Sequence, residues 1–85
     1  MHWNVVIDND MKKYLLKIPK RDAFRIAAVL QEFATNPYAG DIEKMEGEED
    51  TWRRRIGSYR ILYKILTEQK IINVADIRRR TSNTY

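Results

Sequence analysis

The 85-residue sequence predicts an α+β fold: an N-terminal strand, a two-helix hairpin, and then a largely antiparallel sheet of three to four strands. Two patterns predict this class. Apolar residues recur with the helical period of 3.6 residues in the first half, and they alternate with polar residues in the second half. Turn-forming residues divide these stretches into separate elements. The length suits one domain over residues 1–85, without internal repeats.

The chain is expected to begin with a strand over Trp3–Ile7, where side chains of alternating character suit a half-buried strand. Asp8 or Asn9 can then cap a short helix, because their side chains accept hydrogen bonds from free amides of its first turn. The helix has one apolar face at helical spacing, formed by Met11, Tyr14, Leu15 and Ile18. Pro19 ends the helix, because the residue before a proline is disfavoured in the α region.

A second helix is predicted over about Arg21–Ala34, and Asn36-Pro37 closes it. Its apolar stripe consists of Ile26, Val29, Leu30 and Phe33. The linker Tyr38–Glu49 follows, with a short strand around Ile42–Met45. The two helices are therefore expected to form a hairpin that packs on the sheet.

Three strands are predicted in the second half. Thr51–Ile56 and Tyr59–Leu66 are rich in β-branched and aromatic residues, and Gly57-Ser58 between them predicts a hairpin with a type II′ turn. A further strand is expected over Ile71–Arg79, after a four-residue connection.

The hairpin register gathers cationic side chains. Arg55 then opposes Arg60, and Arg53 opposes Leu62. Because opposed residues share a face of the sheet, Arg53, Arg55 and Arg60 project from one surface. Like charges placed opposite each other destabilise a sheet, whereas guanidinium groups suit phosphate and carboxylate. We interpret the cluster as an anion site; an ion pair of Arg60 with the acidic linker is the structural alternative.

The last strand is expected to extend this cluster. If Leu66 opposes Ile71, then Ile77 opposes Arg60 and Arg79 projects from the cationic face. The other face then carries a hydrophobic core of Trp52, Ile56, Tyr59, Ile61, Tyr63, Ile65, Ile72 and Val74.

Arg54 falls on the core side of the hairpin and is expected to be structural. Asp76, two strands away across Ile61, is its candidate partner, since neighbouring strands are only about 4.8 Å apart.

Charge is unevenly distributed along the chain. The net charge is only +4, but residues 51–85 carry nine Lys and Arg against two acids. Residues 41–50 carry six acids against Lys44. A basic C-terminal half is typical of a nucleic-acid binder, while a solvated surface that keeps the domain soluble is the alternative.

Composition excludes several classes. The chain has no cysteine, so disulfides and thiolate chemistry are excluded and a reducing cytosol is expected. A single histidine, His2, argues against a histidine-rich metal site. No apolar stretch approaches the ~20 residues that cross a bilayer, so no membrane partner is expected.

The motif Trp-Arg-Arg-Arg-Ile-Gly-Ser-Tyr-Arg-Ile-Leu-Tyr at 52–63, placed after a strand and two helices, resembles the RelE/ParE superfamily of bacterial and archaeal toxins. Leu16–Pro19, Asn36-Pro37 and the Arg78–Tyr85 tail fit its pattern too. The resemblance covers essentially the whole chain. It implies the RelE-like fold, which is similar to that of microbial RNases.

Resemblance to the RelE branch implies a ribosome-dependent endoribonuclease that cuts messenger RNA by attack of the 2′-hydroxyl on the adjacent phosphate, without metal or cofactor. Carried over by position, Arg53 and Arg55 match two basic residues of the RelE site. Arg60 matches its phosphate-stabilising arginine and Arg79 a second arginine on the final strand. Tyr85 matches a tyrosine that stacks on the base and takes part in proton transfer.

The implied partners are a cognate antitoxin, the ribosome and messenger RNA, in the cytoplasm. Arg78 and Arg80 can contact ribosomal phosphates, although a solvated strand end is equally consistent with their positions. Lys12, Lys13 and Lys17 fall on the solvent side of the first helix and are further candidates for contacts with ribosomal RNA.

The chain departs from the RelE pattern in two ways. Arg53 and Arg55 replace lysines, and an arginine with a pKa above ~12 cannot act as a general base. The general base would then be Tyr85, ribosomal RNA or water. The chain also lacks the C-terminal helix of many relatives. Two other functions remain open: a ParE-like inhibitor of DNA gyrase, and a non-catalytic relative that binds RNA or antitoxin.

Overall fold

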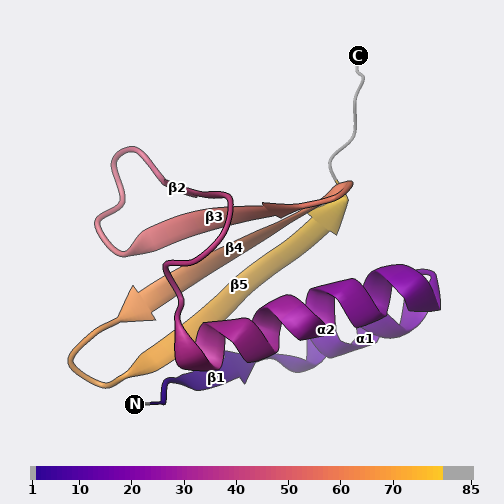
Figure 1. Cartoon of the computed structure of the whole chain (residues 1–85), viewed down its shortest axis with the longest axis horizontal. Coiled ribbons are helices and arrows are strands. Elements are labelled where there is room, and N and C mark those ends of the chain that lie inside the picture. The colour runs from indigo at the N-terminus through magenta and orange to yellow at the C-terminus, as the bar shows by residue number, and fades with distance from the viewer. Residues whose placement is uncertain (1, 80–85) are drawn as a thin grey trace.

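The computed structural model describes residues 2–79 as a five-stranded sheet with two helices (Figure 1). In chain order the elements are β1 Asn4–Ile7, α1 Asn9–Lys17, α2 Lys20–Thr35, β2 Ile42–Lys44, β3 Thr51–Ile56, β4 Tyr59–Leu66 and β5 Ile71–Arg79. The strand order is β1-β5-β4-β3-β2. β1 runs parallel to β5, and the other neighbours are antiparallel. The predicted α+β class is confirmed.

Local chemistry explains where both helices begin. Asp8 has an extended backbone, and its side chain accepts a hydrogen bond of 3.0 Å from the Met11 N–H, so it is the N-cap of α1. Ile18 is also extended, with ψ of 165°, as expected of a residue before proline. Pro19 then sits at the N-cap of α2 with φ of −56°. Asp8 thus fixes the start of α1, and Pro19 fixes the start of α2.

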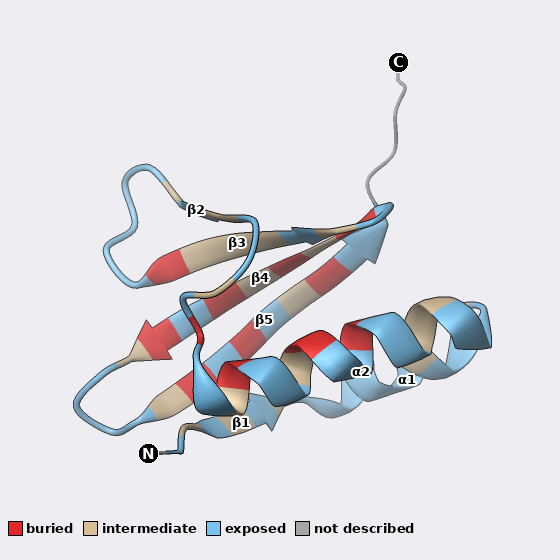
Figure 2. Cartoon of the chain, viewed as in Figure 1, coloured by how far each residue is buried: buried red, intermediate tan, exposed pale blue. Residues whose placement is uncertain are grey.

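The hydrophobic core lies between α2 and one face of the sheet (Figure 2). Its buried apolar side chains are Ile26, Val29, Phe33, Tyr59, Ile61, Tyr63, Ile65, Ile72, Val74 and Ile77. The rings of Phe33 and Tyr63 have centroids 4.3 Å apart, which joins the helix layer to the central strand. The predicted core residues of β4 and β5 are confirmed, with Trp52 and Ile56 partly buried beside them.

The β3–β4 hairpin has the predicted register. Arg55 opposes Arg60, and Arg53 opposes Leu62. Gly57 has a φ of +56°, and Ser58 has no positive φ, as a type II′ turn requires. The positive φ disfavours any other residue at Gly57, and a β-carbon there would also require the Arg25 guanidinium, 2.8 Å away, to move.

The β4–β5 register differs from the prediction beyond its midpoint. Leu66 opposes Ile71 as expected, but a β-bulge shifts the pairing between Leu62 and Tyr63. Ile77 therefore opposes Ile61 in the core rather than Arg60. The bulge reverses the faces of every residue that follows it on β5, since a one-residue shift exchanges the two sides of a strand.

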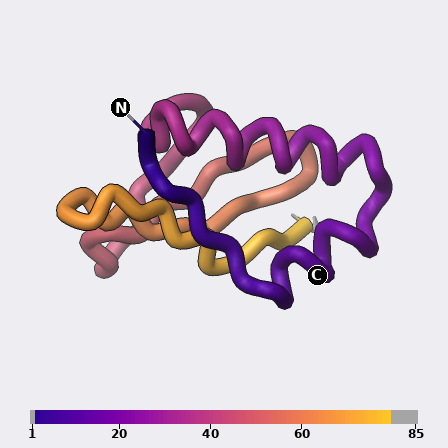
Figure 3. The backbone as a smooth tube through the Cα atoms, turned by 90° about the horizontal axis from the view of Figure 1, so that it is seen from below, coloured from indigo at the N-terminus to yellow at the C-terminus, as the bar shows by residue number. Residues whose placement is uncertain are grey.

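β1 and β5 lie side by side although they are far apart in the sequence (Figure 3). Their pairing ends at Val74, so the last residues of β5 have no neighbouring strand on that side within residues 2–79. α1 lies there instead, and the Met11 sulfur accepts a 3.2 Å hydrogen bond from the Ile77 N–H. In the described part of the chain, neither helix is both long and apolar enough to cross a membrane.

Candidate functional site

The sheet face that points away from the core carries four arginines, which we call the arginine face: Arg53, Arg55, Arg60 and Arg78. They form two rows across the strands. In the first row Arg55, Arg60 and Arg78 are directly opposed on β3, β4 and β5. The second row runs from Glu43 on β2 through Arg53 and Leu62 to Asp76 on β5.

Arg60 is the central member of the three-arginine row. It is partly buried and makes no hydrogen bond or ion pair with any other residue of 2–79. Arginines face it from both neighbouring strands, and opposed like charges destabilise a sheet. An arrangement of this kind favours an anion that sits over all three guanidinium groups.

Two of the other arginines contact carboxylates of the β2 segment. A side-chain oxygen of Glu43 accepts a hydrogen bond from Arg53 Nη2, and Asp41 Oδ2 accepts one of 3.1 Å from Arg55 Nε. Both carboxylates are more than half exposed. Solvent-exposed pairs of this kind contribute only about 0–1 kcal/mol, so a phosphate can replace them at low cost.

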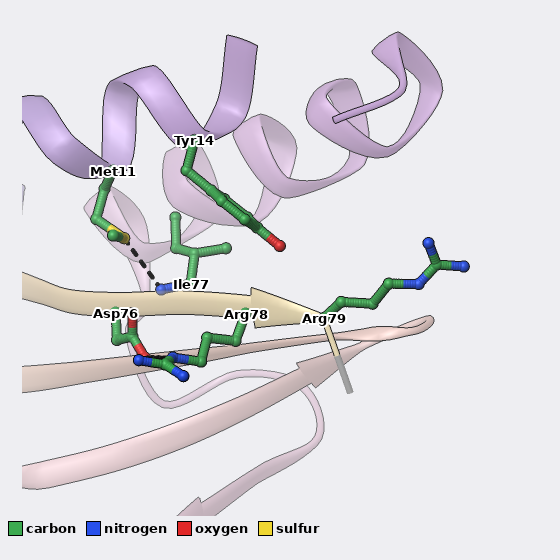
Figure 4. Close-up of a pocket in the computed structure, with 6 residues that line it drawn as sticks. All are labelled: Met11, Tyr14, Asp76, Ile77, Arg78 and Arg79. Atoms are coloured by element: carbon green, nitrogen blue, oxygen red, sulfur yellow. Dashed lines mark hydrogen bonds and ion pairs between the residues drawn. The ribbon is translucent and has the colours of Figure 1, made fainter. Parts of the chain in front are cut away.

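Arg79 lies on the other side of β5, which corrects the prediction that it shares the arginine face. It opposes Tyr59, whose side chain is in the core, and Figure 4 shows it projecting away from Asp76 and Arg78. The bulge is the cause. Arg78 lies opposite Arg60, in the place where Ile77 was expected. Arg80 and Tyr85 lie outside the described residues.

Tyr59, which opposes Arg79 at the end of β5, links the sheet to α2. Its hydroxyl donates a 3.0 Å hydrogen bond to Asp22 Oδ2. Burial raises the pKa of Tyr59, and the hydrogen bond and charge of Asp22 raise it further, while the Arg79 charge opposes the shift. The neutral phenol therefore serves as a structural donor in the core.

Arg54 is structural, as predicted, but with a different partner. Its Nη1 donates hydrogen bonds of 3.1 Å to Glu32 Oε1 on α2 and to the Ala39 carbonyl. Asp76 is turned away by the bulge and instead accepts from Arg78 Nε at 2.6 Å. Gly40 is required beside Arg54, because a β-carbon there would lie 2.3 Å from the guanidinium carbon.

Lys12, Lys13 and Lys17 are exposed on α1 and do not belong to the arginine face of the sheet. They are therefore separate from the three-arginine row. Among residues 2–79, no three His, Asp or Glu side chains gather as a metal site would need.

Lys64 and Asp76 lie on this face although neither was predicted there. Lys64 shares the face of Arg60 because it lies four residues further along β4, and it is exposed. This alternation was visible in the sequence. Asp76 was expected on the core side, and only the bulge brings it to the arginine face.

The chain matches known toxins over nearly its whole length. The family model described as the ParE toxin of the type II toxin–antitoxin system parDE matches residues 3–84. RelE1 of Methanocaldococcus jannaschii, assigned as a toxin, is 30% identical over 83 residues, covering 94% of this chain and 92% of that protein.

Solved structures agree with this match. A chain of the archaeal RelE–RelB complex from Pyrococcus horikoshii has a TM-score of 0.85 at 26% identity, over 98% of this chain and 100% of that one. A chain of the toxin–antitoxin complex RelBE2 from Mycobacterium tuberculosis shares the fold, with a TM-score of 0.80 at 21% identity over 94% and 100%. The chain thus belongs to the RelE/ParE superfamily, as the toxin of a type II toxin–antitoxin system.

Proposed function

We propose that this toxin is a ribosome-dependent endoribonuclease of messenger RNA that works without a metal or cofactor. The observation that carries the proposal is the row of Arg55, Arg60 and Arg78, with Arg60 lacking any partner in residues 2–79. Three opposed guanidinium groups suit an anion with several equatorial oxygens. A phosphate under attack by a 2′-hydroxyl is such an anion.

The arginines would act by electrostatic stabilisation. As the 2′-oxygen attacks, the phosphate becomes five-coordinate and gains negative charge, and preorganised cations stabilise that charge more than that of the starting ester. Arg53 and Arg55 exchange their exposed carboxylate partners for RNA phosphate. Tyr85 and Arg79 remain proposed site residues, although Arg79 approaches from the helix side.

A cognate antitoxin, the ribosome and messenger RNA are the proposed partners, and the cytoplasm is the proposed location. Relatives of this fold have been solved as RelE–RelB complexes, which supports an antitoxin partner. The absence of cysteine and the basic C-terminal half support an intracellular nucleic-acid target.

The first test is Arg60→Ala in a translating extract with a defined message and mapping of 5′ ends. Loss of one preorganised cation should slow cutting within the decoding-site codon by about 10²–10³-fold. Arg21→Ala is the matched control, since Arg21 is exposed on α2, away from the arginine face. An unchanged cleavage ladder with Arg60→Ala would rule out the proposed site.

A second candidate is inhibition of DNA gyrase, favoured by the match to the ParE toxin model. Gyrase supercoiling assays with the purified toxin separate the two functions. Inhibition of supercoiling, together with intact messenger RNA on translating ribosomes, would support the ParE-like activity. If the toxin binds RNA but neither cuts it nor inhibits gyrase, it is a non-catalytic relative.

A further inference from the structure

The β-bulge places a carboxylate among the cations of the arginine face. Asp76 opposes Leu62, in the row next to Arg60 and Arg78, and its side chain is 25% exposed. Without the bulge it would oppose Ile61 in the core. Bulges often redirect a side chain beside an active site. Figure 4 shows Asp76 and Arg78 on the side of β5 opposite α1.

From this geometry we infer that Asp76 is the general base of the RNA cleavage, an inference that rests on the function proposed above. The arginines of the face cannot accept a proton at neutral pH. Carboxylates can, and within residues 2–79 Asp41, Glu43 and Asp76 are those that contact the arginine face.

Of these three carboxylates, only Asp76 lies where a general base would need to be. Asp41 and Glu43 lie at the β2 edge, beyond the arginines they contact, and they are 61% and 68% exposed. Asp76 is the diagonal neighbour of Arg60 on the adjacent strand. Diagonal positions are about 7–8 Å apart. A ribose and its phosphate can therefore lie between the Asp76 carboxylate and the Arg60 guanidinium.

The surrounding groups suit this role. Arg78 Nε donates to Asp76 Oδ2 at 2.6 Å, which orients the carboxylate and leaves Oδ1 without a hydrogen bond in the described residues. Arg60 is its diagonal neighbour on β4, and on the other side Asp76, Arg78 and Tyr14 of α1 line a pocket. That pocket has a volume of about 370 Å³ and opens at the end of β5. Small-ligand sites begin near this size, at roughly 300 Å³.

The chemical step balances with these groups. Asp76 takes the proton of the 2′-hydroxyl while the 2′-oxygen forms a bond to phosphorus. The bond between phosphorus and the 5′-oxygen breaks, and the leaving 5′-oxygen takes a proton from water. The products are a 2′,3′-cyclic phosphate and a 5′-hydroxyl, and Asp76 returns its proton to solvent. Arg60 stabilises the five-coordinate phosphate throughout.

The test is single-turnover cleavage of ribosome-bound messenger RNA at saturating toxin. Asp76→Asn keeps the size of the side chain and an acceptor for Arg78, but it cannot take a proton. We expect cleavage to slow by about 10²–10⁴-fold, the usual contribution of a general base. The affinity for the ribosome and the thermal unfolding midpoint should remain close to those of the parent toxin.

Chemical rescue separates a base from a structural role. With Asp76→Ala, added acetate should restore cleavage in proportion to its concentration, whereas matched chloride should not. Arg60→Ala should show no acetate rescue. Glu68→Gln is the carboxylate control and should cut near the parent rate, since Glu68 is exposed in the turn between β4 and β5.

These experiments distinguish failure of the Asp76 inference from failure of the proposed nuclease function. If Asp76→Asn cuts as fast as the parent toxin, or acetate fails to rescue Asp76→Ala, Asp76 is not the base and the nuclease function stands. If the parent toxin itself leaves the message intact, the proposed function is wrong and the inference falls with it.

Discussion

Arg60 is a residue at which function opposes stability. It faces Arg55 and Arg78 without a carboxylate partner in residues 2–79, so its position favours binding of an anion. Replacing it by a neutral residue of similar length should therefore relieve repulsion. We expect Arg60→Gln to raise the free energy of unfolding by about 0.2–1 kcal/mol in urea titrations while it impairs cleavage. Arg21→Gln is the control; a less stable Arg60→Gln would mean that Arg60 stabilises the fold.

Tyr63 is a residue whose ionisation reports on the core. Its hydroxyl donates a 2.9 Å hydrogen bond to the Pro37 carbonyl, and burial raises its pKa to about 12. The unfolded chain loses this proton near pH ~10, whereas the folded chain keeps it, so stability should fall between pH ~10 and ~12.

Tyr63→Phe should flatten this alkaline loss, because phenylalanine has no proton to release. It should also lower the free energy of unfolding at neutral pH by about 1–3 kcal/mol, since the buried Pro37 carbonyl loses its donor. Urea titrations across the alkaline range measure both effects. The same loss of stability with pH in Tyr63→Phe and the parent would assign the effect to other groups, among which Tyr59 also has a raised pKa.

At the scale of elements, β2 is a short edge strand that supplies counter-charges to the arginine face. Its segment places Asp41 and Glu43 against Arg55 and Arg53. These carboxylates compete with RNA phosphate for the same guanidinium groups. The double variant Asp41→Asn/Glu43→Gln should therefore bind single-stranded RNA more tightly at low salt.

Fluorescence anisotropy with a short RNA measures this affinity. Glu46→Gln/Glu48→Gln, in the neighbouring acidic loop, is the control for net charge, since within residues 2–79 neither residue forms an ion pair with an arginine of the face. Equal gains in both double variants would show that general charge, rather than direct competition, limits binding.

The β5 strand shows where sequence reasoning succeeds and where it fails. The β3–β4 register was predictable because Gly57-Ser58 dictates the turn. The β5 bulge follows from packing instead: it brings Ile77, which is 1% exposed, into the core and turns Asp76 out. The sequence did contain a signal, since Ile72, Val74 and Ile77 break the period of two. A regular strand puts Ile77 opposite Arg60 and Arg79 on the arginine face, whereas the bulge puts Arg78 opposite Arg60.

At the scale of the whole molecule, the parallel pairing of β1 with β5 closes the fold. No local pattern in Trp3–Ile7 specifies its partner strand, because parallel pairing depends on the path of the intervening chain. The helices of that chain provide the core for one face of the sheet and leave the arginine face open. The face of the sheet that packs on the helices thus contributes stability, and the arginine face is available for the proposed RNA site.

The lysines of α1 lie away from the arginine face, so only a large body can contact both surfaces at once. We propose that Lys12, Lys13 and Lys17 contact ribosomal RNA while the arginine face holds the message. The triple variant Lys12→Ala/Lys13→Ala/Lys17→Ala should then weaken ribosome binding and reduce its salt dependence, yet bind a short single-stranded RNA like the parent. Arg78→Ala should weaken both, and with short RNA its salt slope should fall by about 0.7, the value for one phosphate contact on a single strand. Equal ribosome affinity of the triple variant and the parent across the salt series would remove α1 from the ribosome-binding surface.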